Sequence, residues 1–432
     1  MLNNKFYYNL YKNISNHKAK ICVIGLGYVG LKLLLILKKK FLTYGYDNNK
    51  NKISKIKKNL SPLSHIKDSE IKNKNLSQSI ITNLKKISNF NIIIICLPTP
   101  LKNKKPDLSF IINFMKEASP FLKEGQLLIL ESTTYPGTTN EIIKPFIKNK
   151  KLIVGKNFFL GYSPERENPG SKLKFQNVTK ICSGVTKNCQ NLTINLYKKV
   201  TKTVDASSVE HAEFAKLYEN IYRSVNIGLV NEMKMLAKKM NINIYEIIRL
   251  AKTKPFGFKA FYPGPGIGGH CIPVDPYYLS WKAKNINFET KFIDLSGKIN
   301  ELTTDWVYKE TMKIISKNNS KNNLSVLVIG VAYKKNIDDY RESASIKIIN
   351  KLIKNNIRID YHDSFVPKII LDKKFTLKSV DINKNNIKKY TCVILLTDHD
   401  NINYRLILNN SKIIIDTRGK FKNIKRDNIY QL

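Results

Sequence analysis

The sequence contains no apolar run that approaches the roughly twenty residues needed to cross a bilayer. Its N-terminal segment, residues 1–20, is polar and aromatic and lacks the apolar core of an export signal. Cysteine is scarce, with six residues, no CxxC pair and no histidine at the spacing of a zinc ligand. We therefore expect no membrane anchoring, no export, no disulfide scaffold and no metal site, and we expect a cytoplasmic protein.

Acidic residues are also few, 33 against 74 lysines and arginines, which gives a formal net charge of +41. Such an excess is typical of nucleic-acid-binding proteins when it is clustered. Here the lysines are spread among asparagines from end to end, as in Lys50-Asn51-Lys52 and Lys317-Asn318-Asn319. We interpret this as a compositional bias at tolerant surface sites, with no nucleic-acid partner, although the charge would favour a negatively charged nucleotide substrate.

With 432 residues, 42% of them hydrophobic and 10% aromatic, the chain is expected to fold into two or three globular domains. In its first part, short apolar runs alternate with helical patterns. The runs cover Lys20–Ile24, residues 43–46, residues 92–97 and Leu127–Leu130. This alternation predicts a parallel, doubly wound α/β sheet whose strand ends point at one crevice.

Residues 208–240 contain no proline and a single glycine, and their apolar spacing predicts a long helix. After residue 323 the alternation of short runs and helical patterns restarts. We therefore predict an α/β fold with two Rossmann-like doubly wound domains joined by a long central helix. The expected parts are an N-terminal extension (1–18), a Rossmann domain (19–205), a central helical region (206–318) and a smaller Rossmann-like domain (319–432).

A glycine motif, Gly25-Leu26-Gly27-Tyr28-Val29-Gly30, follows the first predicted strand and opens a helix. Gly25 permits a tight turn, Gly27 lets the backbone approach a pyrophosphate, and Gly30 allows close packing. Asp47, at the end of the next strand, would accept hydrogen bonds from the adenosine ribose. The motif predicts an NAD site, and the carboxylate favours NAD over NADP despite the nearby Lys50 and Lys52.

Glycine and proline are concentrated in one segment, Tyr262-Pro263-Gly264-Pro265-Gly266-Ile267-Gly268-Gly269-His270-Cys271. Such loops let a ligand approach the backbone closely. Asp275 follows four residues later and could hydrogen-bond a water or a substrate hydroxyl. A lone cysteine is more often a buried hydrophobe, but this setting predicts that Cys271 is a nucleophile.

Polar residues recur along the predicted central helix at spacings of three, four and seven, at Glu213, Lys216, Asn220, Ser224 and Asn231. They form either a solvated face or, if the helix is buried between two domains, the lining of a wet cavity. In the second case Lys216 and Asn220 would place an ammonium and an amide donor one turn apart. That pair is suited to stabilising an oxyanion.

In their order along the chain, these motifs resemble those of the UDP-glucose/GDP-mannose dehydrogenase family, the nucleotide-sugar 6-dehydrogenases. The resemblance covers nearly the whole chain after residue 18, and the Cys271 loop is most similar to that of bacterial UDP-N-acetylglucosamine 6-dehydrogenases. The matching segments are residues 25–30, 97–100, 131–136, 162–166, Lys216 with Asn220, the Cys271 loop and residues 341–343.

The resemblance implies a four-electron oxidation of the sugar C6 alcohol to a carboxylate with two NAD⁺. After a first hydride transfer, the Cys271 thiolate would add to the aldehyde, and the thiohemiacetal would become a thioester that water hydrolyses. Lys216 and Asn220 match the family's oxyanion stabilisers. Asp275 and Glu165 match its water-handling carboxylates, with Thr134 positioning the same water.

The resemblance also implies the binding residues. Those for NAD are Gly25, Gly27, Tyr28, Val29, Gly30, Asp47, Lys52, Thr99, Thr134 and Arg341. Those for the UDP-sugar are Arg166, Lys216, Asn220, Arg223, Tyr262, Gly268 and Lys334. It further implies that the C-terminal domain binds UDP and that the long helix forms the core of a homodimer.

Departures from the family pattern, at Lys32, Lys52 and Thr303-Thr304-Asp305, do not affect the proposed chemistry. Lys254-Pro255-Phe256-Gly257 stands where relatives that act on the N-acetylmannosamine sugar tend to carry His-Pro-Arg, which disfavours that substrate. UDP-N-acetylglucosamine is the preferred prediction, with UDP-N-acetylgalactosamine, UDP-N-acetylmannosamine and UDP-glucose left open. Two other classes also remain: a two-electron hydroxyacid dehydrogenase, which has no need of Cys271, and a non-catalytic basic binding protein.

Overall fold

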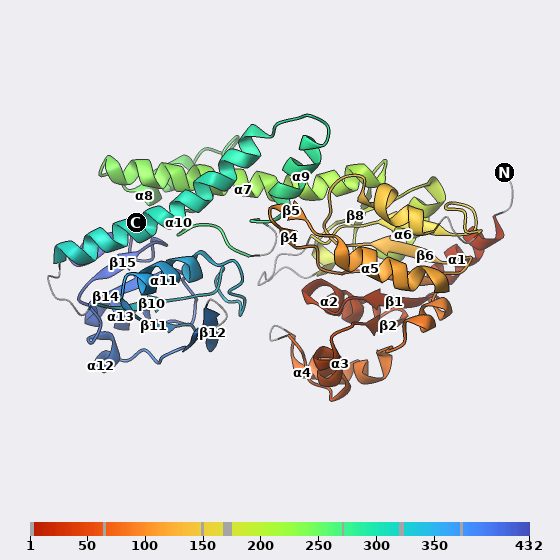
Figure 1. Ribbon diagram of the computed structural model, residues 1–432, viewed down its shortest axis with the longest axis horizontal. Coiled ribbons are helices and arrows are strands. Elements are labelled where there is room, and N and C mark those ends of the chain that lie inside the picture. Colours follow the sequence, from red (N-terminus) through yellow and green to blue (C-terminus); the bar gives the residue numbers. More distant parts are fainter. Residues whose placement is uncertain are drawn as a thin grey trace. The chain divides into compact units, whose positions relative to one another are not determined.

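The computed structural model describes residues 4–63, 66–147, 151–166, 175–269, 272–318, 324–371 and 375–432. Its contacts divide the chain into two compact units. The first comprises Met1–Glu219 and Tyr277–Phe288, and the second comprises Asn220–Pro276 and Glu289–Leu432. Each unit is built around its own sheet (Figure 1).

The first unit contains a seven-stranded sheet. Its strands are β1 (Lys20–Ile24), β2 (Leu42–Tyr46), β3 (Ile92–Ile95), β6 (Leu127–Leu130), β7 (Phe159–Tyr162), β8 (Lys180–Gly184) and β9 (Thr203–Asp205). Their order is β2-β1-β3-β6-β7-β8-β9, and the first five are parallel, which confirms the predicted doubly wound sheet. β8 runs antiparallel to β7, a reversal that the sequence pattern did not predict. The order changes direction between β1 and β3, where such sheets bind ligands.

Helices cover this sheet, and two short strands lie outside it. The helices are α1 (Lys5–Ser15), α2 (Tyr28–Leu37), α3 (Lys50–Lys57), α4 (Asp68–Asn73), α5 (Ser109–Ala118) and α6 (Lys187–Lys198). The outlying pair is β4 (Leu101–Lys102) with β5 (Lys105–Pro106). Shorter helical turns are η1 (Leu76–Ser79), η2 (Leu84–Asn89), η3 (Ser119–Phe121), η4 (Thr139–Ile143), η5 (Lys144–Phe146) and η7 (Phe175–Asn177).

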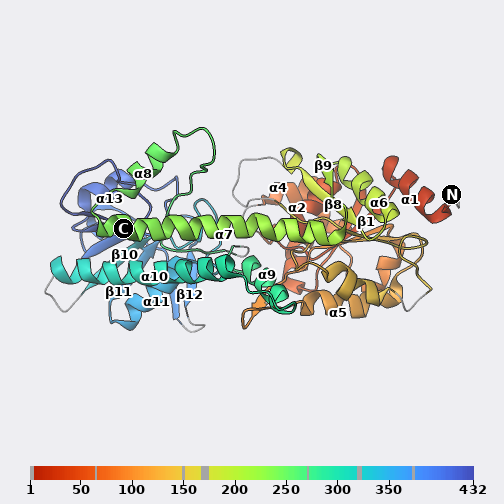
Figure 2. The same cartoon turned by 90° about the horizontal axis from the view of Figure 1, so that it is seen from above.

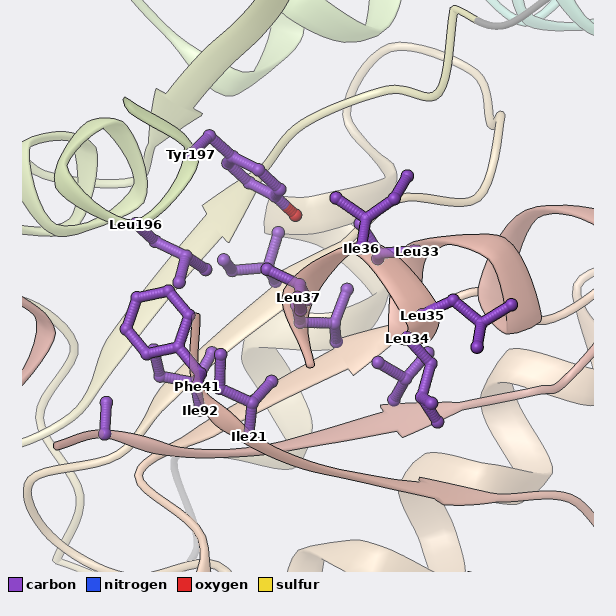
Figure 3. Close-up of a cluster of buried hydrophobic side chains, with 14 of the residues drawn as sticks. Ile21, Leu33, Leu34, Leu35, Ile36, Leu37, Phe41, Ile92, Leu196 and Tyr197 are labelled. Atoms are coloured by element: carbon purple, nitrogen blue, oxygen red, sulfur yellow. The ribbon is translucent and has the colours of Figure 1, made fainter. Parts of the chain in front are cut away.

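The core of the first unit forms where apolar helix faces meet the buried strands. Residues 33–37 of α2 and Leu196 and Tyr197 of α6 surround Ile21 of β1 and Ile92 of β3 (Figure 3). The strands are continuous apolar runs because both faces of the sheet are covered. Each leucine or isoleucine buried here contributes about 1.5–3 kcal/mol relative to an exposed one.

The central helix, α7 (Val209–Lys239), confirms the helix predicted over residues 208–240. Part of it lies next to α10 (Lys291–Asn318) in both views (Figures 1 and 2). Asn231 Nδ2 donates to Asn300 Oδ1 at 3.0 Å, and Ser224 Oγ lies 3.5 Å from Ser296 Oγ. Asn231 and Ser224 are therefore used for packing between α7 and α10.

The second unit contains a five-stranded parallel sheet with the order β11-β10-β14-β15-β16. These strands are β10 (Ser325–Ile329), β11 (Arg358–His362), β14 (Cys392–Leu395), β15 (Ile414–Asp416) and β16 (Ile429–Gln431). Its other elements are α8 (Ile244–Ala251), α11 (Ala344–Lys354), α12 (Lys384–Ile387), α13 (Tyr404–Asn410), and the antiparallel pair β12 (Lys368–Leu371) and β13 (Phe375–Lys378). α9 (Asp275–Lys284) begins in the second unit and continues in the first.

Asparagine, abundant in this chain, is used at helix starts. An asparagine side chain accepts a hydrogen bond from a first-turn backbone N–H at each of several helices, which is the usual N-cap arrangement. These caps are Asn4, Asn49, Asn243, Asn383 and Asn403. Part of the compositional bias therefore serves the local structure.

Candidate functional site

The glycine turn between β1 and α2 has the geometry of a phosphate-binding turn. Gly25 has φ +89°, and a Cβ there would lie 2.7 Å from Cys96 O. A Cβ at Gly30 would lie 1.8 Å from Gly25 O, whereas one at Gly27 would meet nothing within 4 Å. Gly27 is the N-cap of α2 and supplies no side-chain cap. The turn thus leaves open space at a helix N-terminus, where a pyrophosphate would fit.

Asp47 follows β2 and is fixed against this turn. Its Oδ2 accepts from Leu26 N at 2.8 Å, and its Oδ1 accepts from Asn49 N at 2.8 Å. Lys52 Nζ lies 3.3 Å from Oδ2. The predicted NAD residues of this turn are therefore brought together, with Tyr28 and Val29 as the first residues of α2. A carboxylate in this position suits the ribose hydroxyls of NAD and repels a 2′-phosphate.

Thr99 and Thr134 follow β3 and β6, two neighbouring strands of the sheet. Thr99 Oγ1 donates to Thr133 O at 2.8 Å. Thr134 is fully buried, and its Oγ1 has no hydrogen-bond partner in the described structure. Because buried hydroxyls are nearly always satisfied, a water or a ligand group is expected beside Thr134.

Glu165, which follows β7, belongs to a buried charge cluster that the sequence analysis missed. Lys180 Nζ lies 3.2 Å from Glu165 Oε2 and 3.1 Å from Glu131 Oε2. Tyr197 Oη donates to Glu131 Oε1. Burial raises the pKa of Glu131 to about 7. Burial alone would lower the pKa of Lys180, but the two carboxylates outweigh it and raise that pKa, so Lys180 is a cation.

Arg166 is held by the protein itself. Its Nη2 donates to Glu219 Oε1 at 2.6 Å and its Nε to Oε2 at 3.3 Å. Its Nη1 donates to Thr179 O at 2.7 Å. The guanidinium predicted to contact the sugar nucleotide is thus fixed in one orientation by a two-point ion pair with α7.

The polar stripe of α7 is buried, which excludes its interpretation as a solvated face. Its members are Glu213, Lys216, Asn220, Ser224, Asn231 and, three residues further on, Lys234. Large apolar side chains are exposed on the same helix: Phe214, Tyr218, Tyr222, Leu229, Met233, Leu236 and Met240, the last just after the helix end. α7 therefore buries several charged and amide groups while part of its exposed surface is apolar, which is unusual for a surface helix.

Glu213, at the start of the stripe, has structural partners. Glu213 accepts from Gly137 N at 2.6 Å, and from Thr139 N and Oγ1 at 2.9 and 2.7 Å. Burial raises the pKa of Glu213 to about 7. These bonds fix the segment that follows Thr134.

The middle of the stripe contains the predicted oxyanion and water-handling groups. Asn220 Nδ2 donates to Asp275 Oδ2 at 2.5 Å, and both residues are buried. Lys216, one turn earlier on α7, is 7% exposed and forms no hydrogen bond or ion pair with any described residue. A buried ammonium without a partner is costly, so an anionic or strongly polar ligand group is expected next to it.

The glycine loop that leads to Cys271 is anchored to the same helix. Gly264 N donates to Asn231 Oδ1 at 3.0 Å, and Lys234 Nζ donates to Gly264 O at 2.9 Å. A Cβ at Gly268 would lie 2.7 Å from Tyr333 Cβ, so no side chain fits there. Tyr262 is exposed. His270 and Cys271 lie outside the described residues. Lys234 was not predicted, although it continues the spacing of the stripe.

Two predicted substrate cations converge in the second unit. Lys334 follows the turn after β10, and its pKa is lowered by burial and then by the charges of Arg223 and Lys335. Such mutual repulsion would be relieved by a bound diphosphate. Arg341 is also in this unit, where it donates to Asp339 Oδ1 and Oδ2 at 2.8 and 2.6 Å.

Within the described ranges, no group of three or more His, Cys, Asp and Glu side chains is arranged to hold a metal ion. In the same ranges, no helix is both long enough and apolar enough to span a membrane.

Three family models match the chain in sequence. They describe the NAD binding domain (residues 19–201), the central domain (residues 210–302) and the UDP binding domain (residues 327–423) of the UDP-glucose/GDP-mannose dehydrogenase family. Together they cover most of the chain and include all of the residues described for the candidate site.

Similar proteins have related activities. A UDP-N-acetyl-D-glucosamine 6-dehydrogenase of Pseudomonas aeruginosa is 35% identical over 80% of this chain and 83% of its own length. A UDP-N-acetyl-D-mannosamine dehydrogenase of Methanocaldococcus jannaschii is 34% identical over 93% of this chain and 92% of its own. The solved UDP-D-ManNAc dehydrogenase from Pyrococcus horikoshii has a TM-score of 0.83 at 30% identity and covers 95% of this chain and 98% of its own.

Proposed function

The chain belongs to the UDP-glucose/GDP-mannose dehydrogenase family and is an NAD-dependent UDP-sugar dehydrogenase, and we propose that it oxidises UDP-N-acetylglucosamine at C6 to the carboxylate. NAD accepts one hydride from C6 in each of two steps. The observation that carries this proposal is the buried polar stripe of α7, with Lys216 and the Asn220–Asp275 pair. A buried ammonium and a buried carboxylate suit a reaction that forms oxyanions and then consumes water.

In the first step the C6 hydroxyl loses its proton as the hydride leaves. Lys216 would stabilise the oxygen as negative charge develops on it, because its ammonium has no described partner to compete. Asn220 uses one amide N–H for Asp275 and has a second for the same oxygen. Both groups are pre-oriented by α7, so little reorganisation is required.

In the second step we propose that the Cys271 thiolate adds to the aldehyde carbon and that a second hydride transfer yields a thioester. The loop before Cys271 is anchored at Gly264 by Asn231 and Lys234, which would limit its freedom and aid the attack. Water would then release the acid, with Asp275 and Glu165 as the carboxylates that handle its protons. The buried hydroxyl of Thr134 would hold that water.

The charged diphosphate of the substrate is assigned to Arg223 and Lys334, since their mutual repulsion favours a bound dianion. The choice of sugar rests on the sequence Lys254-Pro255-Phe256-Gly257, which stands where the family resemblance places His-Pro-Arg in the N-acetylmannosamine enzymes. Relatives of both activities are about equally similar, at 35% and 34% identity.

The test offers UDP-N-acetylglucosamine, UDP-N-acetylgalactosamine, UDP-N-acetylmannosamine and UDP-glucose in turn to the purified protein and follows NADH. We expect the highest kcat/KM with UDP-N-acetylglucosamine, and a preference for another sugar would contradict the assignment. Cys271→Ser should abolish turnover while the affinities for NAD and UDP-sugar stay within about twofold. Full turnover in that variant would contradict the covalent mechanism.

We also propose a homodimer formed through α7. The supporting observation is the exposed apolar face of this helix, with Tyr218, Leu229 and Leu236 among its most exposed members. A row of this kind is typical of a protein interface. Light scattering should give about twice the 49.8 kDa chain mass. A Leu229→Glu, Leu236→Glu double variant should be monomeric, whereas Lys238→Glu, an exposed position at the end of α7, should not change the mass. A monomeric wild type would contradict the proposal.

A further inference from the structure

Lys180 lies at the centre of the buried charge cluster of the first unit, at a point where three strands end or begin. Glu131 directly follows β6, Glu165 follows β7 by three residues, and Lys180 is the first residue of β8. Because β8 is antiparallel to β7, its beginning lies at the carboxyl end of β7. The reversal of the sheet at β8 thus places an ammonium at the edge where parallel sheets hold their ligands.

The three side chains differ in their access to solvent. Glu131 is 0% exposed, Lys180 is 4% exposed and Glu165 is 14% exposed. Glu165 is therefore the member that can reach a water or a ligand, and Glu131 is the member that cannot. Lys180 Nζ lies between the two carboxylates, 3.1 Å from Glu131 Oε2 and 3.2 Å from Glu165 Oε2. It also lies 3.4 Å from Pro164 O and 4.9 Å from the ring centre of Tyr197.

A gain in stability is a weak explanation for this cluster. Desolvation cancels most of the attraction in a buried ion pair, and well-packed apolar residues are often at least as stabilising. Glu131 is further fixed by Tyr197, and Glu165 Oε1 accepts from Arg166 N at 2.9 Å. A chain of contacts therefore runs from the buried Glu131 through Lys180 Nζ to Glu165 Oε2.

We propose that Lys180 is a positioning residue for Glu165, holding its carboxylate in place and ionised for the hydrolysis step. This inference rests on the proposed function. In that step the water oxygen bonds to the thioester carbon and the C–S bond breaks. One water proton passes to Glu165, the departing sulfur leaves as a thiolate, and nothing is oxidised or reduced. Glu131 acts indirectly, because it holds Lys180, which in turn holds Glu165.

The charges that face Glu165 have opposite effects on its ionisation. The Lys180 ammonium favours the carboxylate, and the Glu131 carboxylate disfavours it. Among the described residues, the other titratable groups of the cluster are Cys96 after β3, Cys182 and Tyr197, and burial raises the pKa of each. These three are neutral, so within the described part of the chain Lys180 and Glu131 carry the opposing charges. The Arg166 guanidinium is paired with Glu219.

This balance predicts two opposite shifts. Lys180→Met should lower kcat at least tenfold and move the acid limb of the kcat profile to higher pH, because Glu165 then needs a higher pH to ionise. Glu131→Gln should move the same limb to lower pH. Lys180→Arg, which keeps the cation, should restore most of the activity.

The measurement is rapid-mixing kinetics of NADH formation with UDP-N-acetylglucosamine from pH 5 to 9. If hydrolysis alone is slowed, Lys180→Met should still give a fast burst of two NADH per active site, followed by a slow steady state, with an unchanged KM for NAD. Lys282→Met is the matched control, because it breaks a lysine–glutamate pair of the same unit, with Glu141 at 2.8 Å, away from this cluster. It should retain wild-type kcat and pH limb.

Wild-type kcat and an unmoved acid limb in a folded Lys180→Met variant would overturn the proposal. If that variant fails to fold, Glu131→Gln decides, and an unmoved limb or a shift to higher pH would overturn the proposal. A wild-type enzyme that releases one NADH per sugar would instead contradict the proposed function, and with it any role of Lys180 in hydrolysis.

Discussion

The turns that follow β1 and β10 occupy equivalent places in the two parallel sheets, yet they are built for different tasks. In both units an aspartate at the end of the neighbouring strand accepts hydrogen bonds from the turn, Asp47 in the first and Asp363 in the second. The first glycine of each turn is enclosed, since a Cβ would lie 2.7 Å from Cys96 O at Gly25 and 2.3 Å from Thr397 O at Gly330. Two residues later the turns differ: a Cβ at Gly27 would meet nothing within 4 Å, whereas Ala332 is fully buried.

Asp363 has no capacity left for a ligand. Its Oδ2 accepts from Val331 N, Ala332 N and His399 Nε2 at 2.7, 3.0 and 3.0 Å. His399 Nδ1 accepts from Asn336 N, so the hydrogen of its imidazole is on Nε2. Backbone N–H groups further along the chain satisfy Oδ1. A shared strand–turn–acid arrangement therefore predicts an NAD site only where the acid and the turn stay accessible.

The largest effect is expected from Asp363→Ala. It would leave His399 and several backbone donors buried without an acceptor, and we expect the second unit to lose about 3–5 kcal/mol of unfolding free energy. The chain has two tryptophans, one in each unit. In a Trp281→Phe background, fluorescence in urea therefore follows the second unit through Trp306. The exposed Asp381→Ala is the control, and an equal midpoint for the two variants would remove Asp363 from its structural role.

Asp47→Ala should have a smaller effect, and on binding. We expect NAD affinity to fall by about 1–3 kcal/mol, the scale of a hydrogen bond to a charged group. Affinity for the UDP-sugar should not change. Calorimetric titration of both ligands checks this, with the exposed Asp427→Ala as control. An unchanged Kd for NAD would mean that Asp47, like Asp363, does not contact NAD. That result would contradict the difference between the two turns.

Gly27→Ala should weaken NAD binding while leaving the stability of the fold nearly unchanged. An added Cβ meets nothing within 4 Å, so the unfolding free energy should change by less than about 1 kcal/mol while NAD binding weakens. Thermal unfolding with and without NAD measures both quantities. If the variant keeps the full NAD-induced rise in melting temperature, the space at Gly27 is not the pyrophosphate site.

The smallest effect concerns the buried lysines of the two units. Two carboxylates raise the pKa of Lys180, whereas burial and then the charge of Arg418 lower that of Lys234 to about 7. Folded Lys234 therefore binds its proton more weakly than the unfolded chain does. Relative to Lys234→Met, the wild type should gain stability as pH rises from about 7 toward 10.5, whereas below pH 7 the difference should be constant.

Urea midpoints of the wild type and Lys234→Met at pH 6, 7, 8 and 9, followed through Trp306, measure this slope. The proton of Lys180 itself should contribute no slope over the same range, because its folded pKa lies above the unfolded value. If the stability difference between the wild type and Lys234→Met does not change with pH, burial does not lower the pKa of Lys234.

The sequence predicted the regular parts of the fold well. The bounds of β1 and β6 and the extent of α7 within one residue follow from local apolar patterns, which do not depend on distant contacts. The length of α10 and the presence of α1 were not predicted. The antiparallel β8 could not be predicted, because strand direction is decided by pairing with β7 and not by the strand's own composition.

Part of the candidate site was also predicted, again from a local sequence pattern. The regular spacing on α7 indicated Lys216 and Asn220, and Lys234 could have been found by extending it by three residues. Lys180 looked like another surface lysine in a lysine-rich chain, and only the order β6-β7-β8 places it between Glu131 and Glu165. The sequence could not indicate that Asp363 is enclosed, because its partner His399 is 36 residues away.

The most direct test of the account is the stoichiometry of NADH formed when a limiting amount of UDP-N-acetylglucosamine is oxidised to completion. The four-electron mechanism predicts two NADH per sugar and a product with a new carboxylate. One NADH per sugar, with an aldehyde or ketone product, would contradict it.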